Sequence, residues 1–222
     1  CYQHAGPGSM PLPDLVAVNG AAARDQYLKG GYPQELLVEV EALRYQYLAN
    51  VGGGRKPADP EIPARLRVLV LGEYLALNTE RQMRLLEETA PYLPKNVKFI
   101  VKPHPACPVR AEDYPGLELE ITNERISHLL GSCDVAYTNN ATSAAVDACC
   151  AGVPVVSMLD PESFNLSPLR GREGVQFVST PGELARALIG GTSDVRGAFQ
   201  PTEFFALDPS LSRWRKLLSG VT

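Results

Sequence analysis

The segment Lys102-Pro103-His104-Pro105 is the first candidate for chemistry, and it directly follows the apolar run Phe99-Ile100-Val101. A histidine between two prolines is conformationally restricted, because proline fixes its own φ and limits the residue before it. A rigid imidazole at a strand end can donate a hydrogen bond to a phosphate oxygen or protonate a leaving group. Lys102 adds positive charge beside it. The alternative is an ordinary turn with a surface histidine.

A run of hydroxyl and amide residues, Thr138-Asn139-Asn140-Ala141-Thr142-Ser143, precedes an alanine-rich segment that we expect to be helical. Hydroxyl residues at a helix start cap its free N–H groups. The same N–H groups and the helix dipole also bind anions. Asn140, Thr142 and Ser143 are therefore expected either to bind a phosphate or to cap the helix, since both roles share one geometry.

A long polar loop from Asp160 to Gly171 follows the strand expected at residues 153–158. Binding residues concentrate on loops that a rigid sheet holds in place. We predict a specificity loop here, and an ordinary solvated loop is the alternative. Its candidate binding side chains are Asp160, Glu162, Asn165, Ser167 and Arg170.

The elements that must position these residues alternate between strands and helices over residues 64–195. Units of about 30 residues indicate a parallel sheet with right-handed crossovers. In such an open sheet, ligands bind outside the carboxyl ends of the strands, where all three candidate segments lie. The expected fold is α/β, a Rossmann-like parallel sheet with helices on both faces. Strands are expected at 67–72, 97–101, 117–121, 134–137, 153–158 and 175–178, and helices at 79–90, 125–130, 142–150 and 182–189.

Two further pieces flank this domain. Residues 1–50 contain two short apolar runs, at 14–19 and 36–40, around a segment expected to be helical. Residues 51–63 are rich in glycine and proline and are predicted to be a linker. Residues 196–222 are predicted to be a helical extension that Trp214 packs onto a domain.

The composition is that of a globular chain of 222 residues, with 45% hydrophobic and 21% charged residues, which excludes disorder, collagen and coiled coil. A net charge of -4 argues against a nucleic-acid partner. We expect no transmembrane helix and no signal peptide. The five cysteines lack a CxxC motif and zinc-type spacing, so buried reduced thiols are expected, with no metal site and no cofactor. A cytoplasmic location follows from these expectations.

Taken together, these residues resemble GT-B glycosyltransferases, whose C-terminal half is a Rossmann-like domain that binds the nucleotide of an activated sugar. The His-Pro pair and the later Thr-Ser pair resemble, more narrowly, bacterial sialyltransferase-like and Kdo-transferase-like enzymes that use CMP-sugars. The resemblance implies that His104 with Pro105, and Thr142 with Ser143, hold the nucleotide phosphate.

The chain is also similar to a family of bacterial surface carbohydrate biosynthesis proteins over most of residues 2–190. The similarity is carried by the order and spacing of short motifs. They are Tyr2-Gln3-His4, Pro11-Leu12-Pro13-Asp14, Val18-Asn19-Gly20, Gly31-Tyr32-Pro33, Ala42-Leu43-Arg44-Tyr45, Lys102–Pro105 and Phe164–Gly171.

This resemblance implies a metal-independent glycosyltransferase of capsule or lipopolysaccharide biosynthesis, with a donor of the CMP-Kdo or CMP-sialic acid type. The acceptor would be a glycan or glycolipid, which implies peripheral contact with the inner membrane. His104 would act catalytically by stabilising charge on the leaving phosphate, and Lys102 would pair with the phosphate or the sugar carboxylate. Alternatives are a nucleotide-sugar epimerase or CDP-polyol phosphotransferase of the same fold, and a non-catalytic nucleotide-sugar-binding or assembly module.

The length is too small for two full nucleotide-binding α/β domains. In GT-B enzymes an N-terminal domain binds the acceptor and usually supplies the catalytic carboxylate. Residues 1–50 would be only the tail of such a domain. The resemblance therefore implies that the rest is missing from this chain or comes from a partner chain, and no catalytic base or nucleophile is assigned.

Overall fold

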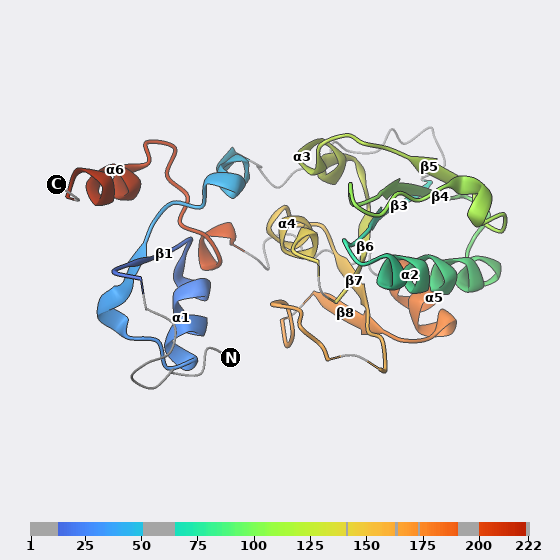
Figure 1. Cartoon of the computed structure of the whole chain (residues 1–222). Coiled ribbons are helices and arrows are strands. Elements are labelled where there is room, and N and C mark those ends of the chain that lie inside the picture. Colours follow the sequence, from blue (N-terminus) through green and yellow to red (C-terminus); the bar gives the residue numbers. More distant parts are fainter. Residues whose placement is uncertain are drawn as a thin grey trace. The chain divides into compact units, whose positions relative to one another are not determined.

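The computed structural model describes residues 13–50, 65–140, 142–162, 164–172, 174–190 and 200–220. The chain divides into two compact units (Figure 1). Unit 1 combines residues 1–52 with residues 200–222, and unit 2 spans residues 53–199. The expected linker at 51–63 and the motif residues 2–4 and 11–12 lie outside the described residues.

Unit 2 contains a six-stranded, wholly parallel sheet, so the expected α/β fold is confirmed. The spatial order is β5-β4-β3-β6-β7-β8. The chain moves outward from β3 to β5, returns to the other side of β3 with β6, and then moves outward again. The strands are β3 (Leu66–Leu71), β4 (Val97–Lys102), β5 (Leu119–Ile121), β6 (Val135–Asn139), β7 (Val155–Met158) and β8 (Val175–Val178).

Helices cover both faces of this sheet. Figure 1 shows α2 (Ala76–Thr89) and α5 (Pro181–Gly190) together on one side, and α3 (Ile126–Leu129) and α4 (Ala144–Cys150) on the other. Strands covered on both faces are apolar almost throughout, which is why β3 is buried from Val68 onward. The connections between these helices and strands contain three short 3-10 turns, η3 (Ala90–Tyr92), η4 (Ala111–Asp113) and η5 (Leu130–Ser132).

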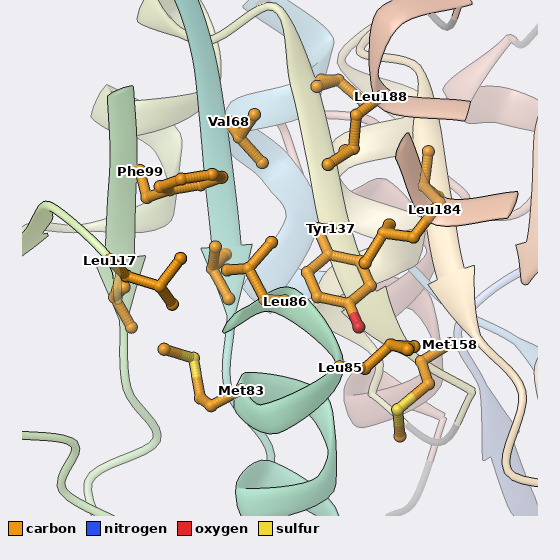
Figure 2. Close-up of a cluster of buried hydrophobic side chains, with 14 of the residues drawn as sticks. Val68, Met83, Leu85, Leu86, Phe99, Leu117, Tyr137, Met158, Leu184 and Leu188 are labelled. Carbon is orange, nitrogen blue, oxygen red and sulfur yellow. The ribbon is translucent and has the colours of Figure 1, made fainter. Parts of the chain in front are cut away.

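The main core lies between the sheet and the α2–α5 pair (Figure 2). Leu86 of α2 and Leu184 of α5 are fully buried in it, as the helical spacing of apolar residues predicts. Tyr137 is also fully buried, and its hydroxyl donates a hydrogen bond to the Gln82 carbonyl oxygen at 3.2 Å. Burial raises the pKa of Tyr137, so its hydroxyl stays a donor.

Several element boundaries differ from the expectation: α2 begins three residues earlier than expected, β5 and β7 each begin two residues later, and the boundaries of β6 and α4 bear on the candidate site. β6 continues for two residues beyond Tyr137, because Thr138 and Asn139 pair in register with Ser157 and Met158 of β7. These polar residues resemble a loop in sequence, yet both are buried. As a result, α4 begins at Ala144, later than expected. The four described cysteines are buried thiols, as expected; they are Cys107, Cys133, Cys149 and Cys150.

Unit 1 is built on a small parallel sheet of β1 (Val16–Val18) and β2 (Leu37–Glu39), with α1 (Ala21–Lys29) in the connection between them. The 3-10 turns η1 (Gln34–Leu36) and η2 (Leu43–Asn50) flank β2. None of the helices in the described ranges is long and apolar enough to cross a membrane.

The C-terminal segment completes unit 1 with η6 (Pro201–Glu203) and α6 (Ser212–Ser219). The Ala206 N–H donates to the Asn19 carbonyl oxygen, and the Ala206 carbonyl oxygen accepts from the Ala42 N–H, both at 2.9 Å. A Cβ atom at Gly20 would lie 2.3 Å from the Phe204 carbonyl oxygen, so only glycine allows this close backbone approach. Residues 204–206 thus pack against the backbone of residues 19, 20 and 42.

Candidate nucleotide-binding site

The order of the strands makes the β3–β6 pair the topological switch point of the sheet, which is where open parallel sheets commonly bind ligands. These strands are neighbours, yet the helices that follow them, α2 and α4, lie on opposite faces of the sheet (Figure 1). Such a switch point leaves space outside the carboxyl ends of the two strands. Gly72 and Glu73 follow β3 at this edge, and Asn140 follows β6.

His104 is exposed in a tight turn after β4, and Pro105 beside it is also exposed. The Cys107 N–H donates to the His104 carbonyl oxygen at 2.9 Å, and the Ala106 N–H donates to His104 Nδ1 at 3.2 Å. Because Nδ1 accepts, the neutral imidazole carries its proton on Nε2. His104 can therefore donate a hydrogen bond to an external acceptor such as a phosphate oxygen.

The His104 turn is held against the end of β3. The Gly72 N–H donates to the carbonyl oxygen of the half-buried Lys102 at 3.0 Å, and a Cβ at Gly72 would lie 3.2 Å from His104 N. The Cys107 thiol donates to the Tyr74 carbonyl oxygen at 2.7 Å. The Tyr74 ring also meets the imidazole edge-on, with the ring centroids 6.4 Å apart. This turn and the switch point are therefore neighbouring parts of one edge.

The polar residues of the segment before α4 make different contacts. Thr142 Oγ1 accepts a hydrogen bond from the Ala144 N–H at 3.3 Å, so Thr142 satisfies one free N–H of the helix start. Ser143 is exposed at the N-cap, and its side chain makes no capping hydrogen bond. Asn140 is buried, and its Nδ2 donates to the Phe164 carbonyl oxygen at 2.9 Å. Asn140 therefore holds the loop after β7 against the end of β6.

The two carboxylates of the predicted specificity loop are held by Arg81 on α2. Arg81 Nη1 pairs with Asp160, whose side chain is largely buried, and Nη2 lies 3.0 Å from Glu162 Oε2. The hydrogen bond and charge of Asp160, with the charge of Glu162, raise the pKa of Arg81. Asp160 and Glu162 thus anchor the loop to α2, a contact between residues far apart in the sequence.

The remaining predicted residues of the loop bond to one another. Asn165 Oδ1 accepts from the Ser167 N–H at 3.0 Å, and Ser167 Oγ accepts from the Leu169 N–H at 3.2 Å. Arg170 Nη1 donates to the Asn165 carbonyl oxygen at 3.1 Å. Phe164 is 87% exposed at the start of this stretch. The loop is therefore ordered by its own polar groups and presents an aromatic ring to solvent.

Replacing Arg81 by methionine is expected to loosen the loop, because it removes both anchoring ion pairs and keeps a similar aliphatic stem. Hydrogen exchange of the amides of residues 160–170 should become several-fold faster, whereas exchange in β3 should not change. High salt should weaken the wild-type loop in the same direction, since it screens partly exposed pairs. Arg84→Met on the same helix is the control, because Arg84 pairs locally with Glu80.

Glu73 is the candidate residue that the sequence patterns missed. It is only 2% exposed, and its Oε2 accepts hydrogen bonds from Asn78 Nδ2 at 2.8 Å and from Asn139 Nδ2. Its backbone is also fixed, because Thr79 Oγ1 accepts from the Glu73 N–H and donates to its carbonyl oxygen. The sequence feature that could have identified Glu73 was its position, two residues after the apolar run that forms β3.

No family model matches the chain, and no curated protein matches it. Solved structures do match. UDP-GlcNAc 2-epimerase from Methanocaldococcus jannaschii, in complex with UDP-GlcNAc and UDP, superimposes with a TM-score of 0.63 at 13% identity, over 93% of this chain and 61% of that one. S. aureus MnaA, in a co-structure with UDP, gives 0.61 at 11% identity, over 92% and 58%.

A third match is the Anabaena protein Alr3699/HepE in complex with UDP and glucose, with a TM-score of 0.52 at 17% identity, over 94% of this chain and 63% of that one. At these identities the likeness shows the fold alone. The chain spans about three fifths of the length of these three structures. It has the α/β fold of part of a GT-B or epimerase structure, with a six-stranded parallel sheet, which confirms the expected fold class.

Proposed function

We propose that this chain binds the nucleotide of an activated sugar and forms the donor-binding part of a bacterial glycosyltransferase of surface polysaccharide biosynthesis. The observation that carries the proposal is the exposed His104 imidazole, whose Nδ1 is occupied by a backbone N–H beside the switch point. Its Nε2–H is then free to meet a phosphate at the edge where parallel sheets bind ligands.

In the proposed reaction, the bond between the sugar and the nucleotide phosphate breaks, and negative charge builds on the phosphate. The His104 Nε2–H, the Lys102 ammonium and the exposed Ser143 hydroxyl would stabilise that charge. Thr142 would keep the start of α4 in place through its contact with the Ala144 N–H. Lys102 would pair with the phosphate or with a sugar carboxylate.

The identity of the nucleotide is a separate part of the proposal. The sequence resemblance favours a CMP-activated acidic sugar such as Kdo or sialic acid, with a glycan or glycolipid as acceptor. The matched structures instead contain UDP, in complexes of an epimerase and of other proteins. The acceptor site, for which the described residues offer no carboxylate that we can assign, would belong to another domain or a partner chain.

A UDP-sugar epimerase is the second candidate, because an epimerase gives a TM-score of 0.63 with this chain. A non-catalytic nucleotide-sugar-binding module is the third. Selective stabilisation by UDP would favour the epimerase. Nucleotide binding without release or transfer of the sugar, even with acceptor present, would favour the binding module.

The test is thermal denaturation of the chain with CMP, CDP and UDP, in the wild type and in His104→Ala. We expect at least one nucleotide to raise the melting temperature of the wild type. The affinity for it should fall about tenfold or more in His104→Ala, because a charge-assisted hydrogen bond to phosphate is lost.

His128→Ala is the matched control, since His128 is an exposed histidine on α3 of the same unit. It should respond to nucleotides like the wild type. No response of the folded wild type to any of the three nucleotides would overturn the proposed function. An unchanged affinity in His104→Ala would remove His104 from the site.

A further inference from the structure

The buried Glu73 carboxylate occupies the switch point itself. Glu73 follows β3, and through its Oε2 it receives the side-chain amide of Asn139, the last residue of β6. Asn78, in the first turn of α2, donates to the same oxygen. One carboxylate oxygen thus joins the two strands of the switch point and the helix that follows the first of them.

The other oxygen of this carboxylate is different. Among the described residues, none donates a hydrogen bond to Glu73 Oε1, although that atom is buried. A buried acceptor without a donor loses the free energy of its hydration and regains nothing from the protein. The side-chain amides of Asn78 and Asn139 donate to Oε2 instead. A ligand that brings its own donor to this point would satisfy Oε1.

The chemistry of a carboxylate decides which part of a ligand that is. An ionised carboxylate only accepts hydrogen bonds and repels phosphate oxygens, which also only accept. The donors in a nucleotide sugar are the hydroxyl groups of the pentose and of the sugar and the N–H groups of the base. The two hydroxyl-bearing rings are the groups attached directly to the phosphates, beside which His104 is proposed to bind. The Glu73 position is also adjacent to the His104 turn, since the Gly72 N–H donates to the Lys102 carbonyl oxygen and the Tyr74 ring meets the His104 ring edge-on.

We propose that Glu73 Oε1 accepts a hydrogen bond from a hydroxyl of the bound nucleotide sugar, directly or through one water. Glu73 is then a binding and specificity residue that reads a hydroxyl, while His104 reads the phosphate. This inference rests on the proposed function and assigns a contact to a residue outside the three predicted segments. The hydroxyl belongs either to the pentose or to the sugar.

The test compares Glu73→Gln with Asn78→Ala. In Glu73→Gln the side-chain oxygen can still accept from Asn78 and Asn139, but the free acceptor becomes an N–H donor that opposes a hydroxyl donor. Asn78→Ala removes one donor from Oε2 and leaves Oε1 unchanged. Calorimetric titrations use UDP or CMP, whichever stabilises the wild type more, and the corresponding nucleotide sugar.

We expect Glu73→Gln to melt close to the wild type and to lose about tenfold or more in affinity, as for a hydrogen bond to a charged group. Asn78→Ala should lose much less. A loss already seen with the free nucleotide assigns the pentose hydroxyl, and a loss seen only with the nucleotide sugar assigns the sugar hydroxyl.

Wild-type affinity in a folded Glu73→Gln overturns the inference, and so does an equal loss in both variants, which would make Glu73 purely structural. If Glu73→Gln does not fold, the wild type is titrated with analogues that each lack one pentose or sugar hydroxyl. A loss of about tenfold for one of them supports the contact, and no loss for any overturns it. No nucleotide binding by the wild type overturns the proposed function together with this inference.

Discussion

Replacing Leu86 by alanine is expected to lower the free energy of unfolding of unit 2 by about 3 to 4 kcal/mol. Leu86 is fully buried in the cluster between the sheet and the α2–α5 pair (Figure 2). The variant loses the burial of the leucine side chain, and the packed strands around it can only partly fill the cavity that remains. This core holds α2 in place behind the edge where the candidate site lies.

Urea denaturation followed by far-ultraviolet circular dichroism measures the change. Leu77→Ala is the control on the same helix, because Leu77 is 58% exposed. That variant should change the free energy of unfolding by less than about 0.5 kcal/mol. Equal losses in the two variants would contradict the assignment of Leu86 to the buried face of α2 and of Leu77 to its exposed face.

The sheet could be predicted because its signal is local. The β3 strand is apolar at nearly every position, which is typical of a parallel strand covered on both faces, and its match with the structure is close. The apolar residues of α2 recur at helical spacing, so its buried face was also readable. An apolar run and a helical spacing are both contained within one short segment of the sequence.

The end of β6 could not be predicted from local polarity. Its last two residues are polar, and they belong to the strand because of contacts with distant parts of the chain. Thr138 and Asn139 read as a loop, and the strand continues through them because β7 pairs with it. Glu73 accepts a hydrogen bond from the Asn139 side-chain amide in this buried strand, and these residues are 66 positions apart. A rule based on local polarity therefore ends the strand too early.

The candidate site also combines features that could be inferred from the sequence with features that could not. His104 follows a strand and a proline on each side fixes its backbone, so its place at the sheet edge could be inferred. The roles of Asp160 and Glu162 could not, because their partner Arg81 lies on a helix 79 and 81 residues earlier. Such long-range pairs decide whether a loop carboxylate can bind a ligand or is paired with another side chain of the protein.

The strands and the helix of residues 13–40 could be predicted, but the contact of Glu41 with α6 could not, because it joins residues far apart in the sequence. Glu41 is only 1% exposed, and its carboxylate accepts hydrogen bonds from the backbone N–H groups of Arg213 at 2.8 Å and Trp214 at 3.0 Å. Trp214 Nε1 also donates to the Glu41 carbonyl oxygen at 2.8 Å. A carboxylate at the start of α6 satisfies its free N–H groups and complements the helix dipole.

Replacing Glu41 by alanine is therefore expected to lower the free energy of unfolding of unit 1 by about 2 to 4 kcal/mol, since two N–H groups at the start of α6 lose a charged acceptor. Trp214 is the single tryptophan of the chain, so its fluorescence reports on this unit. Its emission should shift to the red at lower urea concentration in the variant. Glu39→Ala is the control, because Glu39 pairs with the Arg213 side chain at the partly exposed surface of the same helix. Its effect should be small.

The same contact predicts a dependence on pH. Burial alone would raise the pKa of Glu41, but the N–H groups of Arg213 and Trp214 and the Ser212 hydroxyl favour the charged form and bring the pKa below the usual 4.5. A carboxylate with a lowered pKa in the folded state stabilises that state above its usual pKa, and this contribution disappears as the pH falls through the lowered value. The Trp214 transition of the wild type should therefore weaken below about pH 4.5. Glu41→Gln should be less stable at neutral pH and should lack this part of the acid dependence, and an identical acid profile in both proteins would contradict the assignment.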